Sequence, residues 1–160
     1  MDELEIATLG PDDWEVLRSV RLRALREAPA AFGSRYDDWV AAPESRWRDR
    51  LTGVPLNLVA RRGGEPVGMA SGVYDGDDEA ELISMWVDPT VRGAGVAAAL
   101  IDAVVSWAAA AGRTTYLMVR SDNARAIAAY TRAGFVDLGV PPDRDPDEPP
   151  ENKMVHTPSR

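Results

Sequence analysis

Residues 85–112, MWVDPTVRGAGVAAALIDAVVSWAAAAG, join an apolar strand to a long helix through a turn that contains glycine. The apolar run before Asp88 and Pro89 is typical of a strand that ends at a turn. After the turn, apolar side chains recur at helical spacing: Val96, Leu100, Ile101, Val104 and Trp107. Gly112 is a typical helix stop, so this stretch predicts a strand, a turn and the longest helix of the chain.

The turn at residues 92–97, RGAGVA, is suited to holding an anion. Gly93 and Gly95 have no Cβ, so backbone N–H groups can converge at the positive end of the helix dipole. Such a group of amides binds phosphate or pyrophosphate, and Arg92 adds a permanent charge. One alternative is a plain helix start in which the glycines only allow close packing. A dinucleotide-binding loop is disfavoured, because the preceding strand belongs to an antiparallel meander late in the chain.

The segments before this stretch alternate between strand and helix patterns. Residues 3–9 predict a strand, and a helix begins near Trp14. Residues 34–51 predict two short helices, or one helix broken at Pro43. Two strands then form a hairpin and a third follows: LNLVAR (56–61), PVGMASGVY (66–74) and ELISMWV (81–87).

The segments after the long helix predict three further strands and one helix. In order they are the strand TTYLMV (114–119), the helix NARAIAAYTRA (123–133), and the strands FVDLGV (135–140) and NKMVHT (152–157). Residues 141–151 are too rich in proline and charge for regular structure. We therefore expect an α+β fold over residues 1–160: a single domain with a mixed, mostly antiparallel central sheet and helices on both faces.

Composition excludes several chemistries. The 160 residues contain no cysteine, one histidine (His156) and one lysine (Lys153) against 17 arginines. Thiol nucleophiles, thiolate metal sites and disulfides are therefore excluded, and a histidine-rich metal site or a Walker phosphate loop is not expected. A net charge of −8 argues against nucleic acid or an anionic membrane as a partner. No signal peptide or membrane-length apolar run is visible, so we expect a cytoplasmic protein.

Two motifs resemble those of the GNAT superfamily of N-acetyltransferases, in particular its small single-domain bacterial members. The stretch 85–108 is similar to the cofactor-binding motif Gln/Arg-x-x-Gly-x-Gly/Ala, with Arg92, Gly95 and Ala97 at its defined positions. The second motif is SDNARAIAAYTRAGF, residues 121–135, and residues 23–34 resemble the first helix of many members. The resemblance thus covers nearly the whole chain and implies the GNAT fold, in which two splayed strands form the cofactor cleft.

The resemblance implies an acetyl-CoA-dependent N-acetyltransferase and a set of cofactor-binding residues. The pyrophosphate is expected on the turn amides, and the pantetheine arm beside the end of the preceding strand. The expected cofactor-binding residues are Met85, Trp86, Val87, Arg92, Gly93, Ala94, Gly95, Val96, Ala97, Asn123 and Tyr130. A backbone N–H near residues 85–87 is expected to meet the oxyanion. No metal is expected.

Two side chains are expected to carry the chemistry. Tyr130 lies seven residues after Asn123, about 10.5 Å along a helix and on the same face, and the family assigns the matching tyrosine to protonation of the leaving thiolate. The alternatives are a buried aromatic for Tyr130 and a helix N-cap for Asn123. Glu81 is the candidate general base, with an exposed strand-edge acid as the alternative. Met118 stands where some protein N-terminal acetyltransferases have a glutamate, which puts ribosomal-protein acetylation in doubt.

The remaining candidates have mainly structural interpretations. Trp39 and Trp86 could line an acceptor pocket, although core positions are the commoner use of tryptophan. His156 is expected to be structural. The arginines of the first helix are expected to face solvent rather than serve a function: Arg18, Arg21, Arg23 and Arg26.

The predicted reaction is direct transfer of an acetyl group to a primary amine of a small molecule or peptide. A non-catalytic acyl-CoA-binding or sensing module and a transferase for longer acyl-CoAs are the alternatives. Acidic residues gather in 75–81 and 143–151, on the expected acceptor side, and would select a cationic amine. The general base, the acceptor and the oligomeric state, with a homodimer as one option, are left open.

Overall fold

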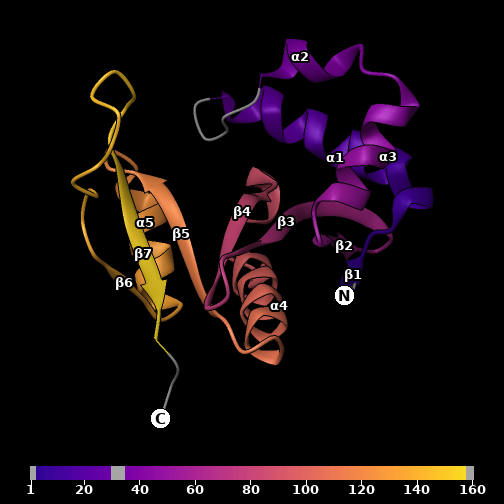
Figure 1. The fold of residues 1–160 in the computed structure, drawn as a ribbon. Coiled ribbons are helices and arrows are strands. Elements are labelled where there is room, and N and C mark those ends of the chain that lie inside the picture. Colours follow the sequence, from indigo (N-terminus) through magenta and orange to yellow (C-terminus); the bar gives the residue numbers. More distant parts are fainter. Residues whose placement is uncertain (1–2, 30–34, 158–160) are drawn as a thin grey trace.

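The computed structural model describes residues 3–29 and 35–157. The helices and strands follow one another in the predicted order, and Figure 1 shows them as a ribbon. The strands are β1 (Leu4–Thr8), β2 (Leu56–Arg62), β3 (Glu65–Asp75), β4 (Glu79–Val87), β5 (Thr114–Arg120), β6 (Phe135–Asp137) and β7 (Glu151–His156). The helices are α1 (Trp14–Glu27), α2 (Tyr36–Val40), α3 (Glu44–Gly53), α4 (Val96–Ala110) and α5 (Ala124–Arg132). Pro43 precedes α3, so the two-helix interpretation of residues 34–51 is confirmed for the described part of that segment.

The strands form one seven-stranded sheet in the order β1-β2-β3-β4-β5-β7-β6. The β4–β5 pair is parallel and the other neighbouring pairs are antiparallel. The parallel pair is the one whose strands are connected by a long helix, α4, as a parallel crossover requires. The predicted mixed, mostly antiparallel sheet is therefore confirmed.

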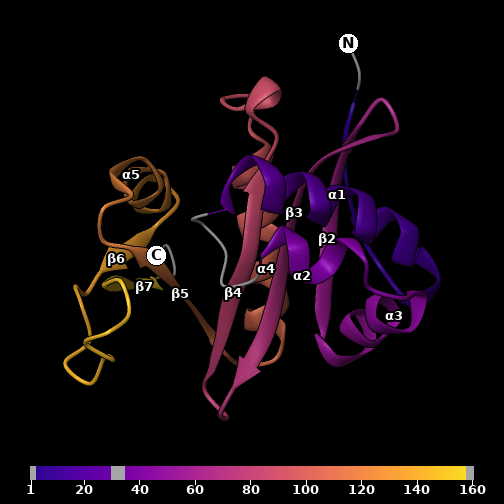
Figure 2. The ribbon, with the colours of Figure 1, turned by 90° about the horizontal axis from the view of Figure 1, so that it is seen from above.

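Helices cover both faces of the sheet. Successive side chains of a strand point to opposite faces, so neighbouring residues pack against different helices. In β2, Leu58 and Ala60 pack into the cluster that includes the apolar stripe of α4. Val59, between them, packs instead with Trp47 and Leu17 of α3 and α1. In Figure 2 the helices α1, α2 and α3 lie on one side of β2 and β3, and α4 lies behind these strands.

The sheet opens between β4 and β5. These strands pair only where Glu79, Ala80 and Glu81 face residues 114–116, and beyond that point they separate, as Figure 1 shows. The far half of the sheet is completed by β7, which lies between β5 and β6. The splayed strands expected from the resemblance are therefore present.

The C-terminal part differs in one respect from the sequence-based expectation. A strand was predicted over residues 135–140, but β6 ends at Asp137. Gly139 adopts a φ of 79°, a left-handed conformation that interrupts an extended strand. Among the described residues, no helix has the length and apolar character needed to cross a membrane.

Candidate active site

A cleft of about 1270 Å³ lies where β4 and β5 separate. Most of the predicted site residues line it: Glu81, Met85, Trp86, Val87, Arg92, Gly93, Gly95, Val96, Ala97, Asn123 and Tyr130. Ala94 is the exception, since it does not line the cleft. The topology thus brings residues from β4, the glycine turn and α5 to one opening.

The glycine turn at the start of α4 has the backbone conformation that the sequence predicts. Gly93 has a φ of 86° and Gly95 a φ of 84°, both in the region that side-chain-bearing residues rarely adopt. Gly95 is the N-cap, and no described side chain accepts a hydrogen bond there from the first turn of α4. The first N–H groups of an α-helix have no partner within the helix, so this turn can bind an anionic group of a cofactor.

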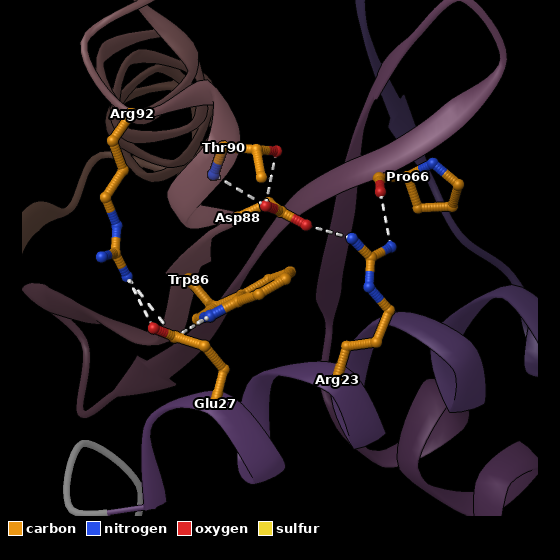
Figure 3. Close-up of polar contacts among 7 residues, drawn as sticks. All are labelled: Arg23, Glu27, Pro66, Trp86, Asp88, Thr90 and Arg92. Atoms are coloured by element: carbon orange, nitrogen blue, oxygen red, sulfur yellow. Dashed lines mark hydrogen bonds and ion pairs between the residues drawn. The ribbon is translucent and has the colours of Figure 1, made fainter.

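The side chain of Arg92 is directed toward α1, as Figure 3 shows. Its guanidinium lies 3.4 Å from Glu27, and Oε2 of the same carboxylate accepts a 2.8 Å hydrogen bond from Trp86 Nε1. Glu27 therefore connects the glycine turn to the end of β4. Trp86 is 5% exposed and lies both in the core against α1 and along the cleft.

A second contact fixes the turn from the same helix (Figure 3). Arg23 donates to the Asp88 carboxylate and, at 2.8 Å, to the carbonyl oxygen of Pro66. Asp88 also accepts hydrogen bonds from the backbone N–H and the hydroxyl of Thr90, at 2.9 and 2.7 Å. These hydrogen bonds, with the ion pair to Arg23, lower the pKa of Asp88. The helix α1 thus holds the β4–α4 connection at two points.

A β-bulge distorts β4 at the cleft. Ile83 faces Ser71 and Trp86 faces Met69, so Ser84 and Met85 together oppose one residue of β3. Ser84 has a φ of 55°, a conformation that costs about 1–2 kcal/mol for a residue with a side chain. A bulge of this kind leaves backbone groups unpaired and bends the strand, which accounts for its divergence from β5.

Helix α5 supplies two of the predicted residues. Asn123 Oδ1 accepts a 3.1 Å hydrogen bond from the N–H of Ala126, so the N-cap interpretation holds while the residue also lines the cleft. Tyr130 packs edge-on against Phe135, with ring centroids 5.8 Å apart. Burial raises the pKa of Tyr130 to about 12, so the phenol stays protonated at neutral pH.

Glu81 lies in a partly buried and largely acidic environment. Burial is the main cause that raises the pKa of this carboxyl, and the charges of Asp75 and Glu151 act in the same direction. The Tyr116 hydroxyl is 2.6 Å from Asp75 and 3.4 Å from Glu81 Oε1. Because a phenol has one proton to donate, the shorter contact takes it and leaves Glu81 able to accept another.

Two arginines that the sequence did not single out as functional line the cleft. Arg21 was expected to face solvent, and this was wrong: it is 3% exposed. It shares the helical stripe of Leu17 and Ala24, at spacings i, i+4 and i+7, so the signal was present in the sequence. Arg50 of α3 is the second, and both guanidiniums reach Ser84 Oγ, at 3.3 and 2.9 Å.

The other residues considered from sequence have structural roles. Trp39 packs 4.8 Å, centroid to centroid, from Trp47 in the core beneath α1 and does not line the cleft. His156 packs against Phe135. Within residues 3–29 and 35–157, no group of three or more His, Asp or Glu side chains is placed to hold a metal ion.

The fold and the two motifs define a family. The model of the acetyltransferase (GNAT) family matches residues 20–135, so the chain belongs to this family. The resemblance seen in the sequence is therefore confirmed.

Individual relatives agree with this assignment. The chain is 31% identical over 135 residues to a mycothiol acetyltransferase of Amycolatopsis mediterranei, a match that covers 79% of this chain and 43% of that protein. The chain thus spans less than half the length of this curated relative.

Solved structures share the fold. An acetyltransferase of the GNAT family from Streptococcus pneumoniae superposes with a TM-score of 0.79 and 19% identity, over 97% of this chain and all of the other. The PaiA N-acetyltransferase of Thermoplasma acidophilum, solved in complex with coenzyme A, gives a TM-score of 0.74 with 18% identity and covers 96% and 98% of the two chains.

Proposed function

We propose that this chain transfers an acetyl group from acetyl-CoA directly to a primary amine of a small molecule or peptide. The observation that carries the proposal is that one cleft is lined by the glycine turn, by Glu81 of β4 and by Tyr130 of α5, where β4 and β5 separate. An acid, a base and an anion site facing one cleft are what acyl transfer from a CoA thioester needs.

The donor would be held mainly by backbone groups. The amides of residues 92–97 would bind the pyrophosphate, with Arg92 as the nearby cation. The amide of Ala94 is the exception, because it donates to the carbonyl oxygen of Val91 at 3.2 Å. The pantetheine arm would extend along the end of β4, beside Met85, Trp86 and Val87, where β5 has already diverged. Asn123 and Tyr130 would border the thioester end from α5.

Glu81 would act as the general base. The Glu81 carboxylate takes one proton from the ammonium group of the acceptor, directly or through water. The free amine nitrogen then attacks the thioester carbon, a carbon–nitrogen bond forms, and the nitrogen loses its second proton to solvent as the intermediate collapses. A raised pKa suits this role, because a carboxylate of higher pKa is a stronger base. A backbone N–H at the Ser84 bulge would stabilise the negative charge on the carbonyl oxygen.

Tyr130 would assist departure of the thiolate. As the carbon–sulfur bond breaks, the phenol donates a hydrogen bond to the sulfur, which leaves as the thiolate and takes its proton from water. An ordinary thiol has a pKa of about 8.5, so complete transfer from Tyr130 to a solvated thiolate is uphill. The phenol therefore works best as a hydrogen-bond donor to sulfur while the bond breaks inside the cleft, where burial raises the thiolate's proton affinity as well.

The relative named mycothiol acetyltransferase supports acetyl transfer as the activity. A non-catalytic acyl-CoA-binding module is less favoured, because such a module needs neither Glu81 nor Tyr130 in the cleft. Titration calorimetry with acetyl-CoA, and with butyryl- and hexanoyl-CoA, tests the binding step. Mass spectrometry of an amine mixture after incubation tests the transfer. Acetyl-CoA binding and an amine heavier by one acetyl group are expected, whereas no CoA binding would refute the proposal.

A further inference from the structure

In the part of the cleft that faces α1 and α3, two cations have no counter-ion among the described residues. The guanidiniums of Arg21 and Arg50 converge on the neutral Ser84 hydroxyl. Salt bridges involving other arginines occur on this chain, but within the described residues neither Arg21 nor Arg50 forms one.

Burial makes this arrangement costly. Arg21 is only 3% exposed, and its Nε has no hydrogen-bond partner in the described structure. The Nε of Arg50 is also buried and unpartnered. Burial, followed by repulsion from Arg50 and Arg46, lowers the pKa of Arg21 to about 9. Stacking of Arg21 on Trp39, at 5.0 Å, leaves the charge uncompensated.

A buried, unpaired charge is normally kept only where a ligand neutralises it. The planar guanidinium suits a carboxylate, which accepts two parallel hydrogen bonds. The glycine turn already provides the anion site for the CoA pyrophosphate, and it follows the end of β4, whereas Ser84 lies at the middle of the cleft-lining residues 81–87. The arginine pair is thus available to the acceptor.

Negative charge lies nearer the start of the same strand, β4. Glu81 and Ser84 are separated by about 10 Å along β4. The charged neighbours of Glu81 are the acids Asp75 and Glu151 and the cation Lys153, which is itself paired with Glu79. An ammonium group is favoured beside these acids, and an anion beside the arginines. The charge pattern along β4 therefore matches a molecule with both charges.

We propose that the acceptor is a zwitterionic amine, whose amino group is directed to Glu81 and whose carboxylate is bound by Arg21 and Arg50. Free amino acids and short peptides are the chemical class with these two groups. This inference rests on the proposed acetyltransferase function and narrows the acceptor, since it adds an anionic group to the cationic amine expected from the acidic composition.

The test compares matched acceptors in steady-state kinetics. Free amino acids and dipeptides are assayed against their C-terminal amides, which retain the amine and lose the carboxylate. Hydrogen bonds between charged groups are worth about 1.5–3 kcal/mol, so the best free acid is expected to have a kcat/KM about 10- to 100-fold above that of its amide. Equal values for acid and amide would overturn the inference, while turnover of both would leave the acetyltransferase function standing.

Variants test whether the two arginines cause the preference for the free acid over its amide. Arg50→Gln should reduce the acid-to-amide ratio to near one, and Arg50→Lys should restore part of it. Arg48→Gln is the matched control: it makes the same charge change on α3, but Arg48 pairs with Asp12 and Glu44 away from the cleft. A ratio that is unchanged in Arg50→Gln, or lost in Arg48→Gln as well, would contradict the assignment. The ratio is measured within one variant, so a loss of folded protein does not alter it.

Discussion

The indole nitrogen of Trp86 donates a 2.8 Å hydrogen bond to Glu27, a residue 59 positions earlier in the chain. The same carboxylate pairs with Arg92, so the cation of the glycine turn is occupied by an internal anion. An incoming pyrophosphate has to compete with this carboxylate for the guanidinium. Under the proposed function, this contact would therefore set part of the affinity for CoA.

Glu27→Gln should tighten CoA binding. The amide oxygen can still accept the Trp86 hydrogen bond, while the negative charge beside Arg92 is removed. The paired side chains are about one-third exposed (32% and 34%), so we expect a gain of about 0.5–1 kcal/mol, a two- to fivefold lower Kd in calorimetry. Weaker binding would mean that the charge of Glu27 positions Arg92 instead of competing for it.

Gly95→Ala should weaken CoA binding, and a substitution at a second glycine, Gly139, serves as its control. An added Cβ at Gly95 meets no atom within 4 Å, so the effect arises from the φ of 84° alone. Relief of about 1–2 kcal/mol of strain would turn the amides of the turn away from the anion. We expect about a tenfold higher Kd and a lower free energy of unfolding.

Gly139→Ala is the control for that variant, since Gly139 has a φ of 79°, open space around it and a position outside the cleft. It should lose similar stability in chemical denaturation and keep its affinity for CoA. Equal losses of affinity in the two variants would show that strain, and not the turn amides, determines binding.

Tyr130→Phe should lower kcat by about 100-fold, within the range typical of general-acid catalysis. The Kd for CoA should change less than twofold, because the hydroxyl forms no hydrogen bond among the described residues and the ring is retained. Rapid-quench kinetics and calorimetry separate the two quantities. A kcat equal to that of the wild type would remove Tyr130 as the acid.

Glu81→Gln should lower activity and raise stability at neutral pH. The folded-state pKa of Glu81 is raised by burial, so the fold favours the protonated form. The cost of ionisation is absent below the unfolded pKa of about 4.3 and grows as the pH rises through the folded value. The melting temperature of the variant should therefore exceed that of the wild type at pH 7 but not at pH 4.

Glu79→Gln provides the comparison on the same strand. Glu79 is paired with Lys153 at 3.4 Å and its side chain is 38% exposed, so it should show no gain at pH 7. A pH-independent difference for Glu81→Gln would contradict the buried-base assignment. In activity, the loss in Glu81→Gln should diminish at high pH, where the acceptor amine is already deprotonated.

The strands and helices within residues 56–133 could be predicted, because the period-two and helical patterns there agree with the positions of the turn residues. The glycine turn was predictable for the same reason, since Gly93 and Gly95 stand where a left-handed conformation is needed. The end of β6 was not, because the apolar residues after Asp137 extend the strand pattern while Gly139 turns the chain.

The convergence of Arg21 and Arg50 on Ser84 could not be predicted, because it depends on contacts between residues that are far apart in the sequence. Arg50 and Ser84 are 34 positions apart, and Arg21 and Ser84 are 63 apart. The bulge that gives Ser84 its positive φ leaves no mark in the sequence, because Ser84 is not a glycine. The helical stripe of α1 did place Arg21 among buried positions, so its burial could have been read from spacing, but its partner could not.

The most direct test of the proposed function is the release of free CoA from acetyl-CoA in the presence of amines. The chain contains no cysteine, so a thiol reagent reports CoA without a background from the protein. We expect acceptor-dependent thiol release by the wild type that falls about 100-fold in Tyr130→Phe. Tight acetyl-CoA binding with no thiol release for any amino acid, peptide, polyamine or aminoglycoside would contradict it and would identify a binding module.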